Sequence, residues 1–219
     1  MEELEEKTWM LMILKFLIIL LTMINYVSSI ESPEYRVILQ YLESDVEIRL
    51  YEESFWVSAA VRNATSFEKS TKDGFHRVYQ YIRGANLNSS QMVITAPILT
   101  TIVPGTHGSD CYVKFYLPAK YAAAPPLPKT ELDLQFERWT SQCLAVKSFS
   151  GFAQDESIRN ETRAFVVTLN KIFDGRTKIL EDTAIFSIAQ YNASSHLSGR
   201  LNEVWLNASA FAVEGCPSF

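Results

Sequence analysis

The chain runs twice through the same order of predicted secondary structure, and this duplication limits its fold more than any single motif. The first half reads as two strands, a helix and two strands, over 46–51, 55–61, 67–83, 93–103 and 111–117. The second half repeats that order over 132–139, 143–149, 157–173, 184–191 and 202–206. An extra strand, 35–42, precedes both. Repetition on this scale indicates one supersecondary unit used twice. The sequence therefore predicts an α+β domain of two β-β-α-β-β units, about 45–117 and 131–206.

The strand predictions rest on alternation of apolar and polar residues. In segment 46–51, Val46, Ile48 and Leu50 share one face and the more polar residues share the other. Segment 132–139 repeats the pattern. A period of two is typical of a strand with one buried face.

Each predicted helix carries an apolar stripe at helical spacing. The first stripe comprises Phe67, Thr71, Phe75, Val78, Tyr79 and Ile82. The second comprises Ile158, Phe165, Leu169, Ile172 and Phe173. Residues 63–66 offer capping groups before the first helix, and Asp174-Gly175 ends the second. Both stripes are expected to pack on the sheet, which predicts a curved antiparallel sheet or open, distorted barrel with two outer helices.

Eight short phrases occur in a specific order along the chain. They are 46–51 (VEIRLY), 55–58 (FWVS), 94–98 (ITAPI), 115–118 (FYLP), 125–128 (PPLP), 149–152 (FSGF), 191–192 (YN) and 199–206 (GRLNEVWL). Together they resemble the SOUL family of haem-binding proteins, and in particular its secreted-looking plant members, over roughly 32–206. The resemblance implies a duplicated α+β barrel, similar to bacterial effector-binding domains, that binds haem or another tetrapyrrole without a covalent bond.

Length and charge agree with one domain that does not bind nucleic acid. The chain has 219 residues and a formal net charge of −5, with no basic stripe. A mildly acidic protein without such a stripe is a poor nucleic-acid binder.

Residues 1–29 are predicted to be a signal peptide, followed by the SOUL-like domain over 30–207 and a tail over 208–219. An apolar run, 16–24, follows Lys15 and precedes the small residues Val27-Ser28-Ser29. The alternatives are a signal anchor or a mispredicted start. Cleavage would leave no stable membrane span and would place the protein outside the cell or in another secretory compartment such as the vacuole.

Five sequons support the secretory route independently of the leader. The candidate glycosylation sites are Asn63, Asn88, Asn160, Asn192 and Asn207. A glycan requires an exposed, luminal asparagine, and some of the sequons could stay unmodified.

Three cysteines, Cys111, Cys143 and Cys216, remain after removal of the leader. An oxidising compartment favours one disulfide and one free thiol, and the sequence leaves all three pairings open. A bridge from Cys216 would pin the tail to the barrel. The alternative is that all three cysteines stay reduced, which an incorrect leader prediction would favour. Their wide spacing matches no metal-binding pattern, so no metal site is predicted.

A haem pocket requires an apolar slot, a cation or hydroxyl for each propionate and, optionally, an iron ligand. The sequence suggests two clusters, which comprise Lys72, Phe75, His76, Tyr79 and Arg83 on the first helix, and His196 with Arg200 before the last strand. The alternative interpretations are a solvated helix edge and a plain turn. His107, in a hairpin loop, is not favoured.

Position 50 departs from the family pattern, because some members carry a histidine there that looks like an axial ligand, whereas this chain has Leu50. Either His76 or Met92 ligates the iron, or the porphyrin is held by its apolar face and propionates alone. The second option predicts a porphyrin carrier or buffer with little discrimination among metals.

Two other classes of function stay open. A secreted interaction protein with a vestigial pocket is compatible with Leu50 and the sequons. A hydrolase would use a pocket carboxylate such as Glu203 as general base, but Glu203 could instead hold the interior by hydrogen bonds. The sequence shows no catalytic triad or phosphate loop, so no enzymatic activity is predicted. The predicted strands also carry three tryptophans, Trp56, Trp139 and Trp205. These side chains could form a porphyrin cage or part of the hydrophobic core, and alternation does not separate the two.

Overall fold

The computed structural model describes residues 12, 15, 30–105, 108–173, 185–192, 198–208, 211 and 213–217. Most of the predicted leader, His107 and His196 therefore lie outside the described residues. Within those residues, no helix has both the length and the apolar character needed to cross a bilayer.

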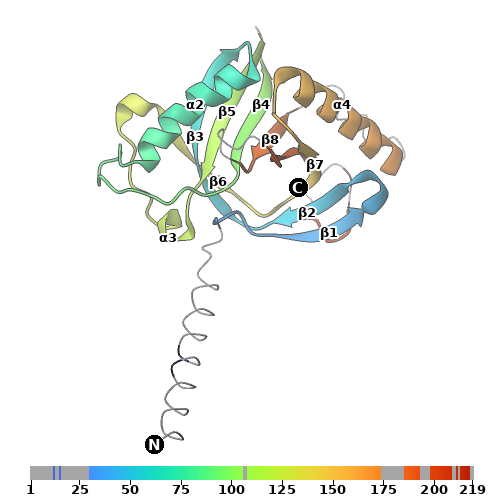
Figure 1. Ribbon diagram of the computed structural model, residues 1–219, viewed down its shortest axis with the longest axis horizontal. Helices are drawn as coiled ribbons and strands as arrows, with labels where there is room; N and C mark the ends of the chain where they lie inside the picture. Colours follow the sequence, from blue (N-terminus) through green and yellow to red (C-terminus); the bar gives the residue numbers. More distant parts are fainter. Residues whose placement is uncertain are drawn as a thin grey trace, which may run out of the picture. The chain divides into compact units, whose positions relative to one another are not determined.

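Nine strands form one antiparallel sheet, with two long helices over it (Figure 1). The first repeat contains β2 (Val46–Tyr51), β3 (Ser54–Ala64), α2 (Phe67–Ile82), β4 (Ile98–Gly105) and β5 (Gly108–Tyr116). The second contains β6 (Leu134–Trp139), β7 (Gln142–Ser150), α4 (Asp155–Ile172), β8 (Phe186–Gln190) and β9 (Leu201–Asn207). The extra strand is β1 (Tyr35–Tyr41), and short turns η1 (Leu42–Ser44), α3 (Ala119–Ala122) and η2 (Thr130–Leu132) connect elements. The predicted α+β fold and element order are confirmed.

The two repeats exchange their first strands. The strand order is β1-β2-β7-β9-β8-β4-β5-β3-β6, so β2 pairs with β7 of the second repeat and β6 pairs with β3 of the first. The repeats also meet at the centre, where β4 pairs with β8. Each half is therefore completed by the other. Among the described residues, the edge strands β1 and β6 each pair on one side only. The curled sheet therefore stays open, as a half-barrel.

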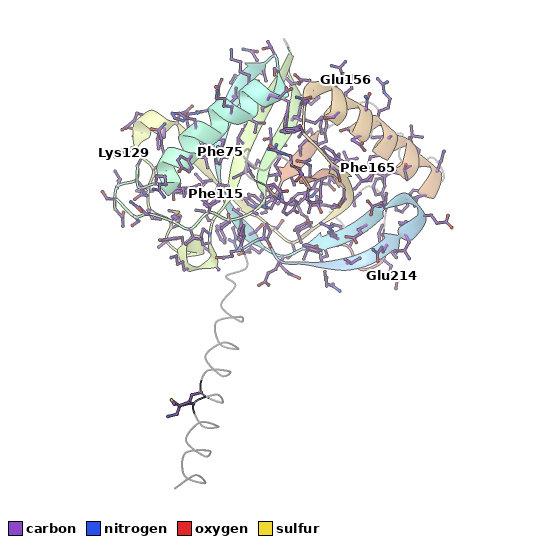
Figure 2. The ribbon with its side chains drawn as sticks, viewed as in Figure 1. Phe75, Phe115, Lys129, Glu156, Phe165 and Glu214 are labelled. Atoms are coloured by element: carbon purple, nitrogen blue, oxygen red, sulfur yellow. A yellow bond between two sulfur atoms is a disulfide. The ribbon has the colours of Figure 1, made fainter. Side chains whose placement is uncertain are left out.

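Both helices pack on the same face of the sheet. Helix α2 covers β3 and β5 through buried residues such as Val78 and Ile82, and α4 covers the other half through residues such as Phe165. Phe165 lies on the side of α4 that faces the sheet (Figure 2). The opposite, concave face is rich in buried aromatic side chains, including Trp56 and Trp205. These two tryptophans therefore belong to the core, as the sequence allowed.

Two local predictions are wrong. The strand predicted over 93–103 begins only at Ile98, because Pro97 has no N–H to donate to a ladder. In the first helix, Tyr79 is exposed, whereas Tyr81 is buried and donates a hydrogen bond to the Pro126 carbonyl at 2.9 Å. Both tyrosines lie near the apolar stripe, so spacing alone did not separate them.

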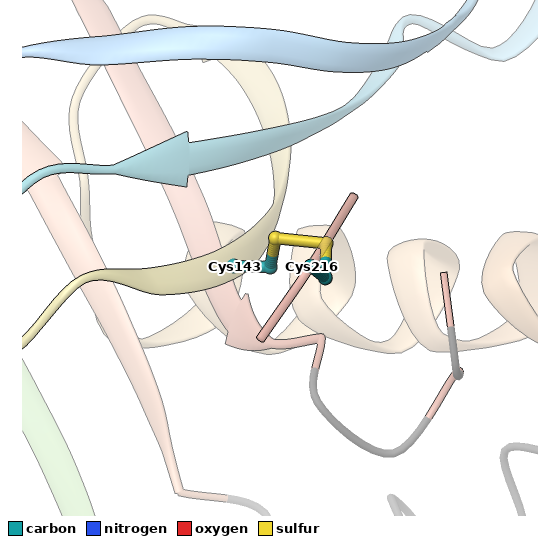
Figure 3. Close-up of a disulfide and its surroundings, with 2 residues drawn as sticks. All are labelled: Cys143 and Cys216. Atoms are coloured by element: carbon teal, nitrogen blue, oxygen red, sulfur yellow. A yellow bond between two sulfur atoms is a disulfide. The ribbon is translucent and has the colours of Figure 1, made fainter. Parts of the chain in front are cut away.

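A disulfide joins Cys143 of β7 to Cys216 of the tail (Figure 3). The two Cα atoms are 5.7 Å apart. Of the three pairings left open by the sequence, the structure contains this one, and Cys111 is a free, buried thiol.

Candidate functional site

The concave face holds a buried carboxylate with all of its charge compensated. Glu203 of β9 accepts hydrogen bonds from Arg49 Nη1 at 2.9 Å, from the Tyr191 hydroxyl at 2.6 Å and from Trp205 Nε1 at 2.7 Å. Arg49 also contacts Glu47 through Nε at 2.6 Å. Burial, followed by the charge of Glu203, raises the pKa of Tyr191, so this hydroxyl remains a donor.

This arrangement suits a structural role for Glu203 better than a catalytic one. A general base needs a lone pair that faces a substrate, whereas both oxygens of Glu203 already accept hydrogen bonds from buried donors. The adjacent cavity has a volume of about 150 Å³ and is closed at one side by Ser32 and Pro33. Pockets for drug-sized ligands usually hold about 300–1,000 Å³. The hydrogen bonds that the sequence analysis offered as one interpretation of Glu203 are present in the structure.

A larger hollow lies on the helix face, between the start of α2 and the length of α4, and we call it the interhelix groove. Its volume is about 660 Å³. It is lined by Ala64, Thr65, Ser66, Phe67, Ile102, Ser109, Cys111, Asp155, Ile158, Arg159, Thr162, Arg163, Val166, Val167 and Phe186. Strands β4, β5 and β8 supply its floor, α4 supplies one wall, and the end of β3 with the start of α2 supplies the other.

The two walls of the groove are tied together at their N-terminal ends. The Asp155 carboxylate, in the first turn of α4, accepts a hydrogen bond from the Phe67 backbone N–H at the start of α2, at 2.8 Å. Burial alone would raise the pKa of Asp155, but this hydrogen bond and its neighbours lower the pKa overall. The carboxylate is thus ionised at neutral pH and offsets the positive end of the α2 dipole.

Two guanidinium groups lie one helical turn apart on the α4 wall. Arg159 and Arg163 are both exposed and both line the groove. Among the described residues, neither lies within 4.0 Å of a carboxylate oxygen. Residues four apart on a helix project side by side, so the two cations present one positive rim beside an apolar hollow.

Thr162 adds an unsatisfied polar atom to the same wall. Its side chain is 9% exposed, and its hydroxyl has no hydrogen-bond partner in the described structure. A buried hydroxyl without a partner costs about 1–3 kcal/mol, so such groups are rare unless a ligand or water satisfies them. The groove therefore combines an apolar hollow with two cations and one ionised carboxylate, that of Asp155.

The predicted α2 cluster lies away from the groove. Lys72, His76, Tyr79 and Arg83 are exposed along α2 and Phe75 is half-buried, with its ring centroid 5.7 Å from that of Tyr79. None of the five lines the interhelix groove. The structure therefore places them together on one helix flank, but on the outside of the molecule.

The other predicted residues are separated from that flank. Met92 is buried in the core beneath α2. Arg200 is buried, with its guanidinium carbon 4.1 Å from the Phe152 ring centroid, and His196 lies outside the described residues. Leu50 is buried in the core under α4. Among the described residues, no cluster of three or more histidine, cysteine, aspartate or glutamate side chains could hold a metal ion.

A family model described as SOUL heme-binding protein matches residues 30–207. The chain belongs to this family. Heme-binding protein 2 of Homo sapiens is 29% identical over 163 residues, which cover 73% of this chain and 76% of that protein. Heme-binding protein 1 of Xenopus laevis is 26% identical over 162 residues, covering 73% of this chain and 81% of that protein.

Among solved structures, this SOUL chain is similar to the EcmrR C-terminal domain. The TM-score is 0.46 at 10% identity, with 79% of this chain and 96% of that chain covered.

Sequence reasoning about this SOUL chain missed the residues that form the groove. From the sequence, Cys111 was identified only as a disulfide candidate and Thr162 only as the threonine of the Asn160 sequon, and no pattern marked Arg159 or Arg163. One usable signal was present, because Thr162 interrupts the apolar stripe of the second helix between Ile158 and Phe165.

Proposed function

We propose that this protein binds haem or another tetrapyrrole reversibly, in the interhelix groove. The observation that carries the proposal is the combination of a 660 Å³ hollow with Arg159 and Arg163 on one rim. A tetrapyrrole combines an apolar macrocycle with carboxylate side chains, and such a ligand needs both features. Membership of the SOUL family supports the same ligand class.

The residues of the groove fit the group in chemical terms. Phe67, Ile102, Ile158 and Phe186 would contact the macrocycle, because they are apolar and line the hollow. The guanidinium groups of Arg159 and Arg163 would pair with propionates. The iron would supply ligand-exchange chemistry when haem is bound. Because every such contact is non-covalent and therefore reversible, we propose a carrier or buffer for tetrapyrroles.

We also propose that the protein is a secreted-type member of the family. The Cys143–Cys216 disulfide supports an oxidising compartment, where such bonds persist. Asn63, Asn88, Asn160 and Asn207 are exposed, as glycan acceptors must be, and Asn192 is partly exposed. Treatment of protein from a eukaryotic secretory host with an endoglycosidase should lower its apparent mass, and unchanged mobility would contradict glycosylation.

The test of the proposed function is a titration with haemin and with metal-free protoporphyrin, followed by Soret absorbance and tryptophan quenching. The variant Arg159→Gln/Arg163→Gln removes both groove cations. Exposed ion pairs are each worth about 0.2–1 kcal/mol, so binding should weaken by up to about 30-fold. The matched control is Arg36→Gln/Lys171→Gln, which removes the same charge from exposed positions that do not line the groove.

The same titration separates the groove from the α2 flank. If His76→Ala weakens binding and the Arg159/Arg163 variant does not, the site lies on the flank predicted from sequence. If neither haemin nor protoporphyrin gives saturable binding to the glycosylated wild type, the tetrapyrrole function is wrong, and a protein-interaction role becomes the leading hypothesis.

A further inference from the structure

Thr162 is a polar residue at a position of α4 where the fold alone would favour an apolar one. The buried residues of this helix are Ile158, Thr162, Phe165 and Leu169, and Thr162 is the polar member of the set. The other three belong to the hydrophobic core under the helix. Because a stripe of this kind packs against the sheet, a valine, which has the same shape as threonine, would suit position 162 at least as well.

The hydroxyl of Thr162 makes no hydrogen bond within the described part of the chain, although its oxygen is buried. A threonine inside a helix can donate to the carbonyl four residues earlier. Thr168 of the same helix does so, with its hydroxyl 2.9 Å from the Ala164 carbonyl oxygen. The Thr162 hydroxyl is therefore a cost to the folded state, because folding removes the water that would solvate it and supplies no protein atom instead.

The sequence around Thr162 gives the hydroxyl a use outside the folded state. Asn160-Glu161-Thr162 is a sequon, and a sequon requires a hydroxyl on its third residue. Two further sequons have a third residue that the structure describes, and these residues are Thr65, which is exposed, and Ser90, which is half-buried. Among these three, the Asn160 sequon is the one that places its hydroxyl in the core. Burial does not prevent glycosylation, provided that the sequon is recognised before α4 packs on the sheet.

Asn160 itself is exposed, at the outer rim of the interhelix groove. Arg163 and Val167 follow it by three and seven residues, so the three side chains lie along one line of the helix surface. Both of these neighbours line the groove, and Val167 is 48% exposed. A glycan on Asn160 would therefore stand beside the groove and shield an exposed apolar side chain.

We propose that Asn160 carries an N-linked glycan, and that Thr162 is present in α4 as part of the signal for this glycan and not for the fold. The proposal rests on the secretory route proposed above and names one sequon that is occupied. In the transfer, the amide nitrogen of Asn160 displaces the lipid diphosphate from the first sugar of a lipid-linked oligosaccharide. A C–N bond replaces the C–O bond, the amide proton leaves with the diphosphate, and no oxidation state changes.

The first test maps the occupancy of Asn160 on protein secreted from a eukaryotic host. Chymotrypsin should release residues 153–165 as one peptide, in which Asn160 is the only asparagine. Enzymatic removal of the glycan in heavy-oxygen water converts an occupied Asn160 to labelled aspartate, which mass spectrometry detects. Label should be found in the wild type and in Thr162→Ser, and should be lost in Thr162→Val. Thr168→Val, the same change outside the sequon, should keep the label.

The second test measures the cost of the Thr162 hydroxyl to the fold. Asn160→Gln is the background, because neither it nor Asn160→Gln/Thr162→Val can be glycosylated at this position. Adding Thr162→Val should raise the thermal midpoint by about 2–4 °C, since a methyl group replaces a buried hydroxyl without a partner. Adding Thr168→Val instead should not raise it, because that hydroxyl is hydrogen-bonded. A midpoint that Thr162→Val lowers or leaves unchanged would overturn the role given to Thr162.

The occupancy map separates failure of this proposal from failure of the secretory route. If other sequons are occupied and Asn160 is not, the proposal for Asn160 is wrong and the secretory route stands. If Asn160 is labelled in Thr162→Val as in the wild type, the hydroxyl does not serve the sequon. If no sequon of the secreted chain is occupied, glycosylation as a whole is wrong, and the proposal for Asn160 fails with it.

Discussion

The carboxylate of Asp155 accepts a hydrogen bond from the backbone N–H of Phe67 at 2.8 Å, and this bond joins the first turns of the two long helices. The two residues are 88 positions apart and belong to different repeats. The bond closes one end of the interhelix groove, so it couples the shape of the groove to the association of the repeats.

Asp155→Ala should destabilise the protein by about 1 kcal/mol, because it removes a charge-assisted partner from the α2 N-terminus. Urea denaturation followed by far-UV circular dichroism measures the change. Glu156→Ala is the matched control, since Glu156 is exposed in the same turn of α4 (Figure 2). Equal midpoints for the two variants would show that the Phe67 contact contributes nothing measurable.

The stability difference between wild type and Asp155→Asn should depend on pH. The folded-state pKa of Asp155 lies below its usual range, because hydrogen bonds outweigh the opposing effect of burial. A depressed pKa contributes stability above the unfolded-state pKa, about 3.9 for aspartate, and this contribution is lost as the pH falls through the folded value. Denaturation curves at pH 7 should therefore separate the two proteins, and curves well below pH 4 should converge. If the stability difference between wild type and Asp155→Asn persisted in acid, it would arise from the shape of the side chain and not from its charge.

Glu203→Gln should destabilise the fold by about 1–3 kcal/mol, because it removes the buried charged partner of Arg49 and leaves only the more exposed Glu47 to pair with it. Arg49 and Glu203 have side-chain exposures of 8% and 4%. Thermal unfolding measures the loss. The exposed pair Arg138–Glu53 provides the control, and Glu53→Gln should change stability by less than about 1 kcal/mol. Unaltered stability of the Glu203 variant with changed turnover of any substrate would instead favour catalysis.

Removal of the Cys143–Cys216 disulfide should cost about 2–4 kcal/mol. The bridge closes a loop with a sequence separation of 73 and ties the tail to β7. Cross-links of this length stabilise chiefly by restricting the unfolded chain. Cys143→Ser/Cys216→Ser and the reduced wild type should show the same lowered midpoint in guanidinium. If the double variant matches the oxidised wild type, the tail is held by its packing alone.

The repeated order of elements was predictable because local patterns specify it. Alternation over 46–51 and the stripe that includes Ile158, Phe165 and Leu169 are properties of neighbouring residues, and they survive in β2 and α4. For Glu203 the sequence offered two interpretations, a general base or a hydrogen-bonding residue of the interior, and the structure supplies the hydrogen bonds. The chain also carried the family signature over residues 30–207.

Pairing between distant segments was decided only by the tertiary structure. The exchange of β2 and β6 between repeats, the choice of Cys143 as partner of Cys216, and the burial of Tyr81 in place of Tyr79 all depend on which surfaces meet. The groove also depends on tertiary structure, because Cys111 and Thr162 come from different repeats and line one hollow only in the folded chain. Local sequence determines the elements through periodicity and capping, whereas contacts between segments depend on the packing of the whole sheet, which no local pattern encodes.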